Sequence, residues 1–126
     1  MDVRDAIGNI FLFETLDAAQ RRLVAECVSI CHPEQGEHLY HEGDDAFSFY
    51  AVLEGQCKVY RVTPAGDEFI VHIKQEGDVI AEAAMFDVKT YPASCVAMTD
   101  ATLLRIDSRC FIALLLSDSK LSLQIL

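Results

Sequence analysis

The residues best suited to chemistry lie between positions 77 and 98. A Gly-Asp pair leads into a short apolar run, and small residues with one carboxylate follow, Ala81-Glu82-Ala83-Ala84. This segment predicts one or two helical turns, whose first backbone N–H groups lack helical partners and can face an anion. The alternative interpretation is a tightly packed corner without a ligand, because small-residue turns are common.

A polar loop and Pro92 follow, and then a second apolar strand. The whole stretch resembles the phosphate-binding cassette of cyclic nucleotide-binding domains, in the form carried by bacterial CRP/FNR-type transcription regulators. In that family a Glu, matched here by Glu82, holds the ribose 2′-hydroxyl, and an Arg grips the cyclic phosphate. Ala81 stands where Gly is usual. The resemblance implies ligand-binding residues at Ala81, Glu82, Ala83, Ala84, Pro92, Ala93 and Ser94.

The phosphate-gripping Arg is missing from this cassette. Its place is taken by Tyr91-Pro92-Ala93-Ser94, and no Lys or Arg occurs between Lys89 and Arg105. A phosphate needs a charged donor or several N–H groups to offset its lost hydration. We therefore expect a small-molecule effector other than cyclic AMP, either uncharged or metallic.

The cassette looks most like the branch of the family that senses nitric oxide through haem and controls denitrification genes. That resemblance implies haem as a candidate cofactor. Its iron ligand would be a thiolate or one of the four histidines, His32, His38, His41 and His72. The plainer interpretation of each histidine is a surface or hydrogen-bonded residue, and the chain has no c-type haem attachment motif.

An enzyme is the least favoured class. His38 and His41 lie three apart on a predicted strand, so they should point to opposite faces and not share a metal. The cupin pattern of two histidines separated by one residue is absent, and no catalytic triad or carboxylate pair has recognisable flanking residues. We expect no catalytic residues; a small cupin-like enzyme and a stand-alone cyclic nucleotide-binding module remain the alternatives.

Composition limits the partners. The 126 residues carry a net charge of −10, so the chain should not itself bind duplex DNA. The longest apolar run, residues 110–116, is far shorter than the ~20 residues that cross a bilayer. No signal peptide is visible, which predicts a cytoplasmic protein without membrane contact.

Five cysteines occur, at positions 27, 31, 57, 95 and 110. Without an export signal they are expected to be reduced, as ordinary buried thiols. Some relatives in the family hold an iron–sulfur cluster through four cysteines, three of them closely spaced near the N-terminus, and that pattern is absent here.

The remaining elements predict a mainly β domain with flanking helices. Asp17 and Gln20 form a capping-box pattern ahead of a helix from residue 18 to about 27. Glycines then punctuate β-prone runs every 7–12 residues. The predicted strands are 28–32, 37–41, 48–54, 56–62, 68–75, 78–81, 94–98 and 101–107, with turns at 54–55 and 63–67. Eight such strands favour a double-stranded β-helix, the jelly roll or β-roll that the resemblance also implies.

The C-terminal part is predicted to be helical, with a break at residues 117–119. By resemblance, residues 1–118 form the sensor β-roll with its N-terminal helices, and 119–126 begin a helix that pairs two protomers. DNA contact would come only from a helix-turn-helix domain absent from this chain. The alternative is a final helix that docks on its own domain.

Overall fold

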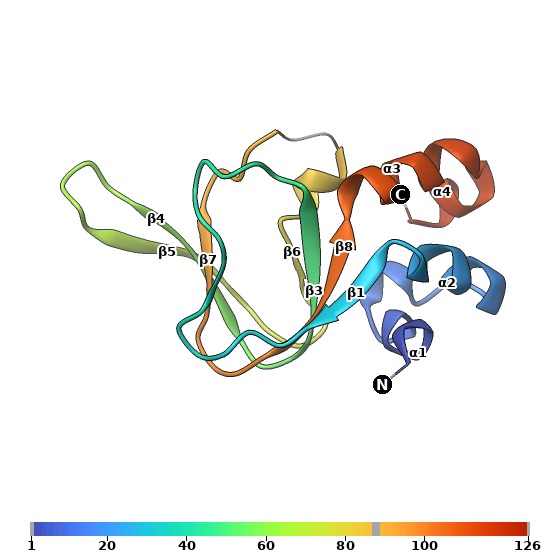
Figure 1. The fold of residues 1–126 in the computed structure, drawn as a ribbon, viewed down its shortest axis with the longest axis horizontal. Coiled ribbons are helices and arrows are strands. Elements are labelled where there is room, and N and C mark those ends of the chain that lie inside the picture. Colours follow the sequence, from blue (N-terminus) through green and yellow to red (C-terminus); the bar gives the residue numbers. More distant parts are fainter. Residues whose placement is uncertain (1, 87–88, 126) are drawn as a thin grey trace.

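The computed structural model describes residues 2–86 and 89–125, and within them two four-stranded sheets face each other as a roll (Figure 1). One sheet has the order β1-β8-β3-β6 and the other β2-β7-β4-β5, all antiparallel. The strands are β1 (Val28–Cys31), β2 (His38–Tyr40), β3 (Ser48–Glu54), β4 (Cys57–Val62), β5 (Glu68–Lys74), β6 (Val79–Ile80), β7 (Ser94–Ala97) and β8 (Thr102–Asp107). The predicted jelly roll is confirmed, and every predicted strand end lies within one residue of the observed one.

Helices cover the outer side of the β1-β8-β3-β6 sheet, where the two chain ends also lie (Figure 1). They are α1 (Val3–Gly8), α2 (Ala18–Ala25), α3 (Ser108–Ser117) and α4 (Ser119–Ile125), with the 3-10 turn η1 (Phe11–Phe13) between the first two. A second 3-10 turn, η2 (Glu82–Phe86), follows β6. The packing of the helices against the sheet forms an aromatic core. The centroid of the Phe111 ring lies 5.2 Å from that of Phe49 and 5.9 Å from that of Phe13.

Local signals in the sequence account for where these helices begin. The Asp17 side chain accepts from the Gln20 backbone N–H, and the Gln20 side chain accepts from the Asp17 N–H, which confirms the predicted capping box. Asp107 caps α3 through a single bond, since its side chain accepts from the Cys110 N–H at 2.8 Å. The helix α2 ends at Ala25, two residues earlier than expected.

The turn at Gly55 does not join paired strands, in contrast to the turn at 63–67. β3 and β4 lie in opposite sheets, so the chain crosses the roll between them, whereas β4 and β5 form the predicted hairpin. Gly55 has a φ of 90°, and a Cβ there would lie 2.6 Å from the Asp100 carbonyl oxygen. This crossing therefore requires glycine.

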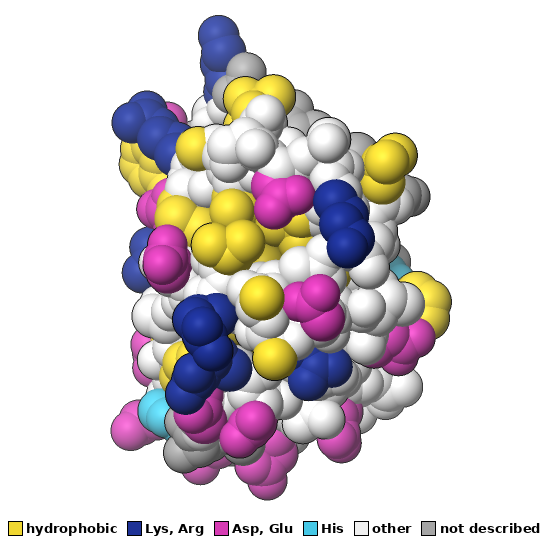
Figure 2. All heavy atoms as spheres, turned by 90° about the vertical axis from the view of Figure 1, so that its right-hand side faces the viewer, with side chains coloured by type: hydrophobic (Ala, Val, Ile, Leu, Met, Phe, Trp, Pro, Cys, Tyr) yellow, Lys and Arg dark blue, Asp and Glu magenta, His cyan; other side chains and the backbone are white. Residues whose placement is uncertain are grey.

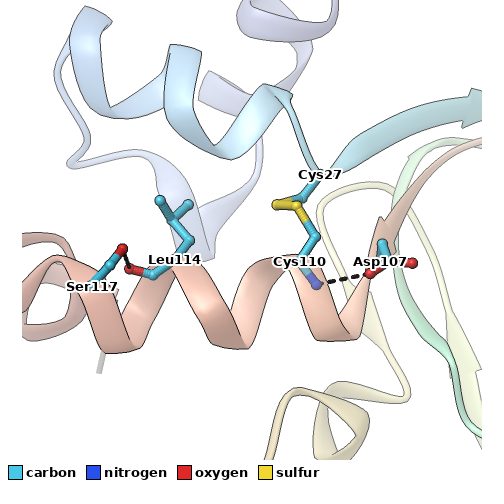
Figure 3. Close-up of a disulfide and its surroundings, with 5 residues drawn as sticks. All are labelled: Cys27, Asp107, Cys110, Leu114 and Ser117. Carbon is cyan, nitrogen blue, oxygen red and sulfur yellow. Dashed lines mark hydrogen bonds between the residues drawn. A yellow bond between two sulfur atoms is a disulfide. The ribbon is translucent and has the colours of Figure 1, made fainter.

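A disulfide joins Cys27 to Cys110, so the expectation of five reduced thiols is wrong for this pair (Figure 3). The two cysteines are 83 residues apart in sequence. The Asp107 N–H donates to the Cys27 carbonyl at 2.9 Å, which brings the start of α3 to the end of α2. Their Cα atoms are then 5.5 Å apart, a usual disulfide separation. Cys31, Cys57 and Cys95 are free thiols.

The last helix folds back onto its own domain. Leu121 of α4 is completely buried and Ile125 nearly so, whereas Leu123 is 82% exposed. The docked helix that the sequence left as an alternative is thus present within residues 119–125. None of the helices in the described part of the chain has the length and apolarity needed to cross a bilayer.

Candidate effector cavity

A cavity of about 210 Å³ lies between the hairpin strands and the predicted cassette. Five of the seven predicted ligand residues line it, namely Ala81, Ala83, Ala84, Pro92 and Ala93. The other walls come from Tyr40 of β2, Val59 of β4, Tyr91, and Val71, His72 and Lys74 of β5. The fold therefore brings most of the two cassette segments together around one space.

Glu82 and Ser94 do not line this cavity. Glu82 begins η2 and its side chain is exposed. Ser94 is buried, and its Oγ accepts from the Glu42 backbone N–H at 2.9 Å. Ser94 thus secures the turn after β2, and a ligand role for these two residues stays a prediction.

Ala81 has an unusual backbone. Its φ is 59°, the left-handed region in which L-residues other than glycine are strained. This conformation ends β6 at Ile80, one residue before the predicted strand end, and turns the chain into η2. The position at which the family usually has glycine is therefore the one that requires glycine-like geometry.

Three tyrosines fill the interior beside the cavity. The Tyr40 and Tyr91 rings stack with centroids 3.8 Å apart, and the centroid of the Tyr50 ring lies 6.2 Å from that of Tyr40. The Tyr91 hydroxyl donates to the Ser48 carbonyl at 2.5 Å. Burial raises the pKa of all three phenols, that of Tyr50 to about 12. At neutral pH these rings are uncharged walls.

Two basic residues line the cavity: His72, one of the four candidate haem ligands, and Lys74, which the sequence analysis did not assign to a site. They come from β5, outside the cassette. Alternation along β5 puts the two residues on one side of the strand. The pairing with β4 shows that this side faces the roll at Lys74, whereas His72, nearer the tip of the hairpin, remains exposed. No arginine lines the cavity in the described part of the chain; Arg105 donates to the Ser48 Oγ, and Arg61 lies 3.6 Å from Glu42.

His38 and His41 stack with ring centroids 4.3 Å apart, so the prediction that they point to opposite faces is wrong. The strand β2 ends at Tyr40 with an irregular register, and His41 already belongs to the following turn. His38 Nε2 also lies 2.6 Å from the Tyr60 hydroxyl. Residues 2–86 and 89–125 contain no group of three or more side chains arranged to hold a metal ion.

Ala84 connects the cavity to the helices. It is buried, and it also lines a second hollow of about 450 Å³ at the start of α3, which Ser108, Arg109 and Ile112 border. The 3-10 turn that contains Ala84 packs against α3. One small residue thus separates the cavity from the first turn of α3.

Comparisons with known proteins agree with this architecture. Residues 31–118 match the model of the cyclic nucleotide-binding domain. Among curated proteins, the transcriptional activator protein Anr of Pseudomonas aeruginosa is 34% identical over 65 residues, which are 52% of this chain and 26% of Anr. A cAMP-dependent protein kinase regulatory subunit of Mycosarcoma maydis is 31% identical over 91 residues, 72% of this chain and 17% of that subunit.

Among solved structures, the sensor domain of the transcriptional regulator DNR from Pseudomonas aeruginosa superimposes with a TM-score of 0.84 at 28% identity. The match covers 95% of this chain and 81% of that one. The chain spans about a quarter of Anr and about a sixth of the kinase subunit. On these findings the chain belongs to the cyclic nucleotide-binding domain family, and its relatives include transcription regulators of the CRP/FNR type.

Proposed function

We propose that this chain is the effector-sensing domain of a CRP/FNR-type transcription regulator and that its effector occupies the 210 Å³ cavity. The observation that carries the proposal is the convergence of two cassette segments, Ala81–Ala84 and Pro92–Ala93, on one mostly apolar space. Concave, mostly apolar sites with few polar groups are typical of small-molecule binding.

The signal would travel through Ala84. An effector in the cavity presses on the 81–84 segment, and this segment packs against the start of α3. If the effector favours one of two positions of α3, it shifts the balance between them. The helix α4 and a DNA-binding domain outside this chain would receive that shift.

Cyclic AMP is not the proposed effector. Its phosphate would meet no arginine among the described residues that line the cavity, and Glu82, which the resemblance assigns to the ribose, is exposed and does not line the cavity. An arginine holds a phosphate through two parallel hydrogen bonds, which Lys74, the single lysine among these described residues, cannot reproduce.

Haem, the candidate cofactor from the sequence, does not fit a cavity of about 210 Å³. Pockets for drug-sized ligands measure roughly 300–1,000 Å³. The volume of this cavity lies below that range, and haem is a large ligand. Of the four histidines only His72 lines the cavity, and its side chain is exposed rather than buried against the interior. Haem therefore enters the proposal only as an arm of its test.

Dimerisation is proposed at the helical end. Figure 2 shows an apolar patch on that end, bordered by acidic and basic side chains. The helices α3 and α4 expose apolar side chains, among them Leu116 and Leu123, which are both more than 80% exposed. A homodimer through the C-terminal helix would cover them.

The test is a set of titrations of the 126-residue chain, followed by NMR, calorimetry and absorbance. Indole serves as a neutral probe, because a cavity of 150 Å³ already accepts benzene. We expect indole to shift the Ala81 and Ala84 signals together with the amides at the start of α3. Cyclic AMP should give no heat at micromolar concentration, and haem should give no Soret shift.

The matched control is Ala83→Trp, at an exposed residue that lines the cavity, so the indole fills the space without changing the core. It should abolish the shifts that free indole causes. Micromolar binding of cyclic AMP would instead favour a stand-alone cyclic nucleotide-binding module. If indole shifts the NMR signals of other residues but not those of residues 81–84, the proposed site is wrong.

A further inference from the structure

The inner face of β5 carries two basic side chains. In the β4–β5 ladder Lys74 pairs with Cys57 and His72 pairs with Val59. Directly opposed residues of an antiparallel pair project to the same face. Because Cys57 is completely buried in the roll, Lys74 projects toward the interior as well.

Lys74 has no partner for its charge among the described residues. It is partly buried, and neither an ion pair nor a side-chain hydrogen bond involves it. The neighbouring Lys58 on β4 differs, because its ammonium pairs with Glu68. A charge held near apolar walls without a counter-ion is unfavourable, so Lys74 is suited to a ligand that brings a negative group.

The charge of Lys74 is felt inside the roll. The hydrogen bond with Cys57 and burial raise the pKa of the Cys95 thiol, while the positive charge of Lys74 acts in the opposite direction. Cys95 is completely buried. Lys74 is itself partly buried and lines the cavity, so its charge lies beside the space that a ligand would occupy.

The other walls suit an apolar body. They are alanine, valine and proline side chains and the rings of Tyr40 and Tyr91. The Tyr91 hydroxyl is already bound to the Ser48 backbone, so the ring offers its apolar surface. The volume of about 210 Å³ accommodates one six-membered ring with a short substituent, since 150 Å³ holds benzene.

We infer that the cavity takes a small monocarboxylate with an aromatic or compact aliphatic body, and that its carboxylate pairs with Lys74. This inference rests on the proposed function and names the chemical class of its effector. It replaces the expectation of an uncharged or metallic ligand, which considered only the cassette and not β5.

The experiment compares phenylacetate with phenylacetamide, which share a shape and differ in charge. Calorimetry on the 126-residue chain should show phenylacetate binding about 10- to 100-fold more tightly, the factor that a hydrogen bond to a charged group contributes. Lys74→Gln should remove this difference, and Lys74→Arg should keep most of it. Lys58→Gln, which removes a lysine from the adjacent strand, should leave the difference unchanged.

A second readout uses the unmodified chain, in case Lys74→Gln does not fold. Higher salt should weaken phenylacetate binding and leave phenylacetamide binding unaltered, because only the former involves an ion pair. The inference is overturned if the two probes bind with equal affinity or if neither binds. It is also overturned if Lys58→Gln loses the affinity difference to the same extent as Lys74→Gln.

The cavity-blocking variant separates this inference from the proposed function. If both probes bind equally and Ala83→Trp blocks both, the cavity is an effector site and only the carboxylate assignment is wrong. If Ala83→Trp leaves both affinities unchanged, the probes bind elsewhere and both proposals fail.

Discussion

The strands β3 and β5 have the same length and opposite surroundings. Both have seven residues, but the first five residues of β3 are buried and the first five of β5 are exposed. β3 lies between β8 and β6, with the roll interior on one side and the helices on the other. β5 is an edge strand that pairs only with β4, and their hairpin projects beyond the roll (Figure 1).

This difference separates a scaffold from a ligand-facing region. The β3 sheet and its helices completely bury the side chains of Phe13, Phe49 and Phe111. β5 contributes only its last part, Val71, His72 and Lys74, to the cavity, and Ile70 and Val71 remain more than half exposed. The candidate site thus lies where the well-buried sheet meets the less buried one, a position at which motion costs few buried contacts.

The sharpest test of this comparison is a pair of matched truncations. Phe49→Ala should lower the free energy of unfolding by about 3–5 kcal/mol, because Phe49 is completely buried against Phe111 and its loss leaves a cavity. Phe69→Ala, on the half-exposed β5, should cost less than about 1 kcal/mol. Urea denaturation measures both. Similar losses would mean that the two strands are equally part of the core.

The next effect concerns the disulfide, which belongs to the scaffold. Reducing Cys27–Cys110, or replacing Cys110 with Ser, should lower stability by about 2–4 kcal/mol, because a cross-link that spans 83 residues restricts the unfolded chain. Thermal denaturation with and without dithiothreitol measures the change. Cys31→Ser is the matched control, since Cys31 is free and partly buried. A reductant effect that persists in Cys110→Ser would show that another pair is bridged.

A smaller effect is expected at the strained turn beside the cavity. Ala81→Gly should raise stability by about 0.5–1 kcal/mol, since relief of the left-handed strain exceeds the added entropy of the unfolded chain. The control is Ala83→Gly, in η2 without positive φ, which should be destabilising. Chemical denaturation distinguishes the two. A loss of stability in Ala81→Gly would mean that the Ala81 methyl packs usefully at the cavity wall.

The smallest expected effect is the pH response of His38, on the ligand-facing sheet. Burial, and then the nearby His41, lower the pKa of His38 below its usual 6.5. The neutral imidazole therefore stabilises the fold above pH 6.5. This contribution is lost as the pH falls, because the unfolded chain takes up the proton more readily. NMR titration of the imidazole signal, assigned with His38→Gln, should show a midpoint below 6.5. A midpoint above 6.5 would contradict the prediction.

Much of the fold could be predicted because its signals are local. Turn glycines and alternating side chains located the eight strands to within one residue, and Asp17 with Gln20 located the start of α2. The cassette resemblance likewise located five of the residues that line the cavity. These features depend on near neighbours in the chain, which a sequence displays directly.

The sequence by itself therefore determined the strands, the caps and the family. Only the tertiary structure decided that Cys27 meets Cys110, that α4 docks on its own domain, and that Lys74 enters the cavity from β5. Each of these depends on which strands pair and on which face is buried, and both follow from packing between segments far apart in the chain rather than from the residues on either side.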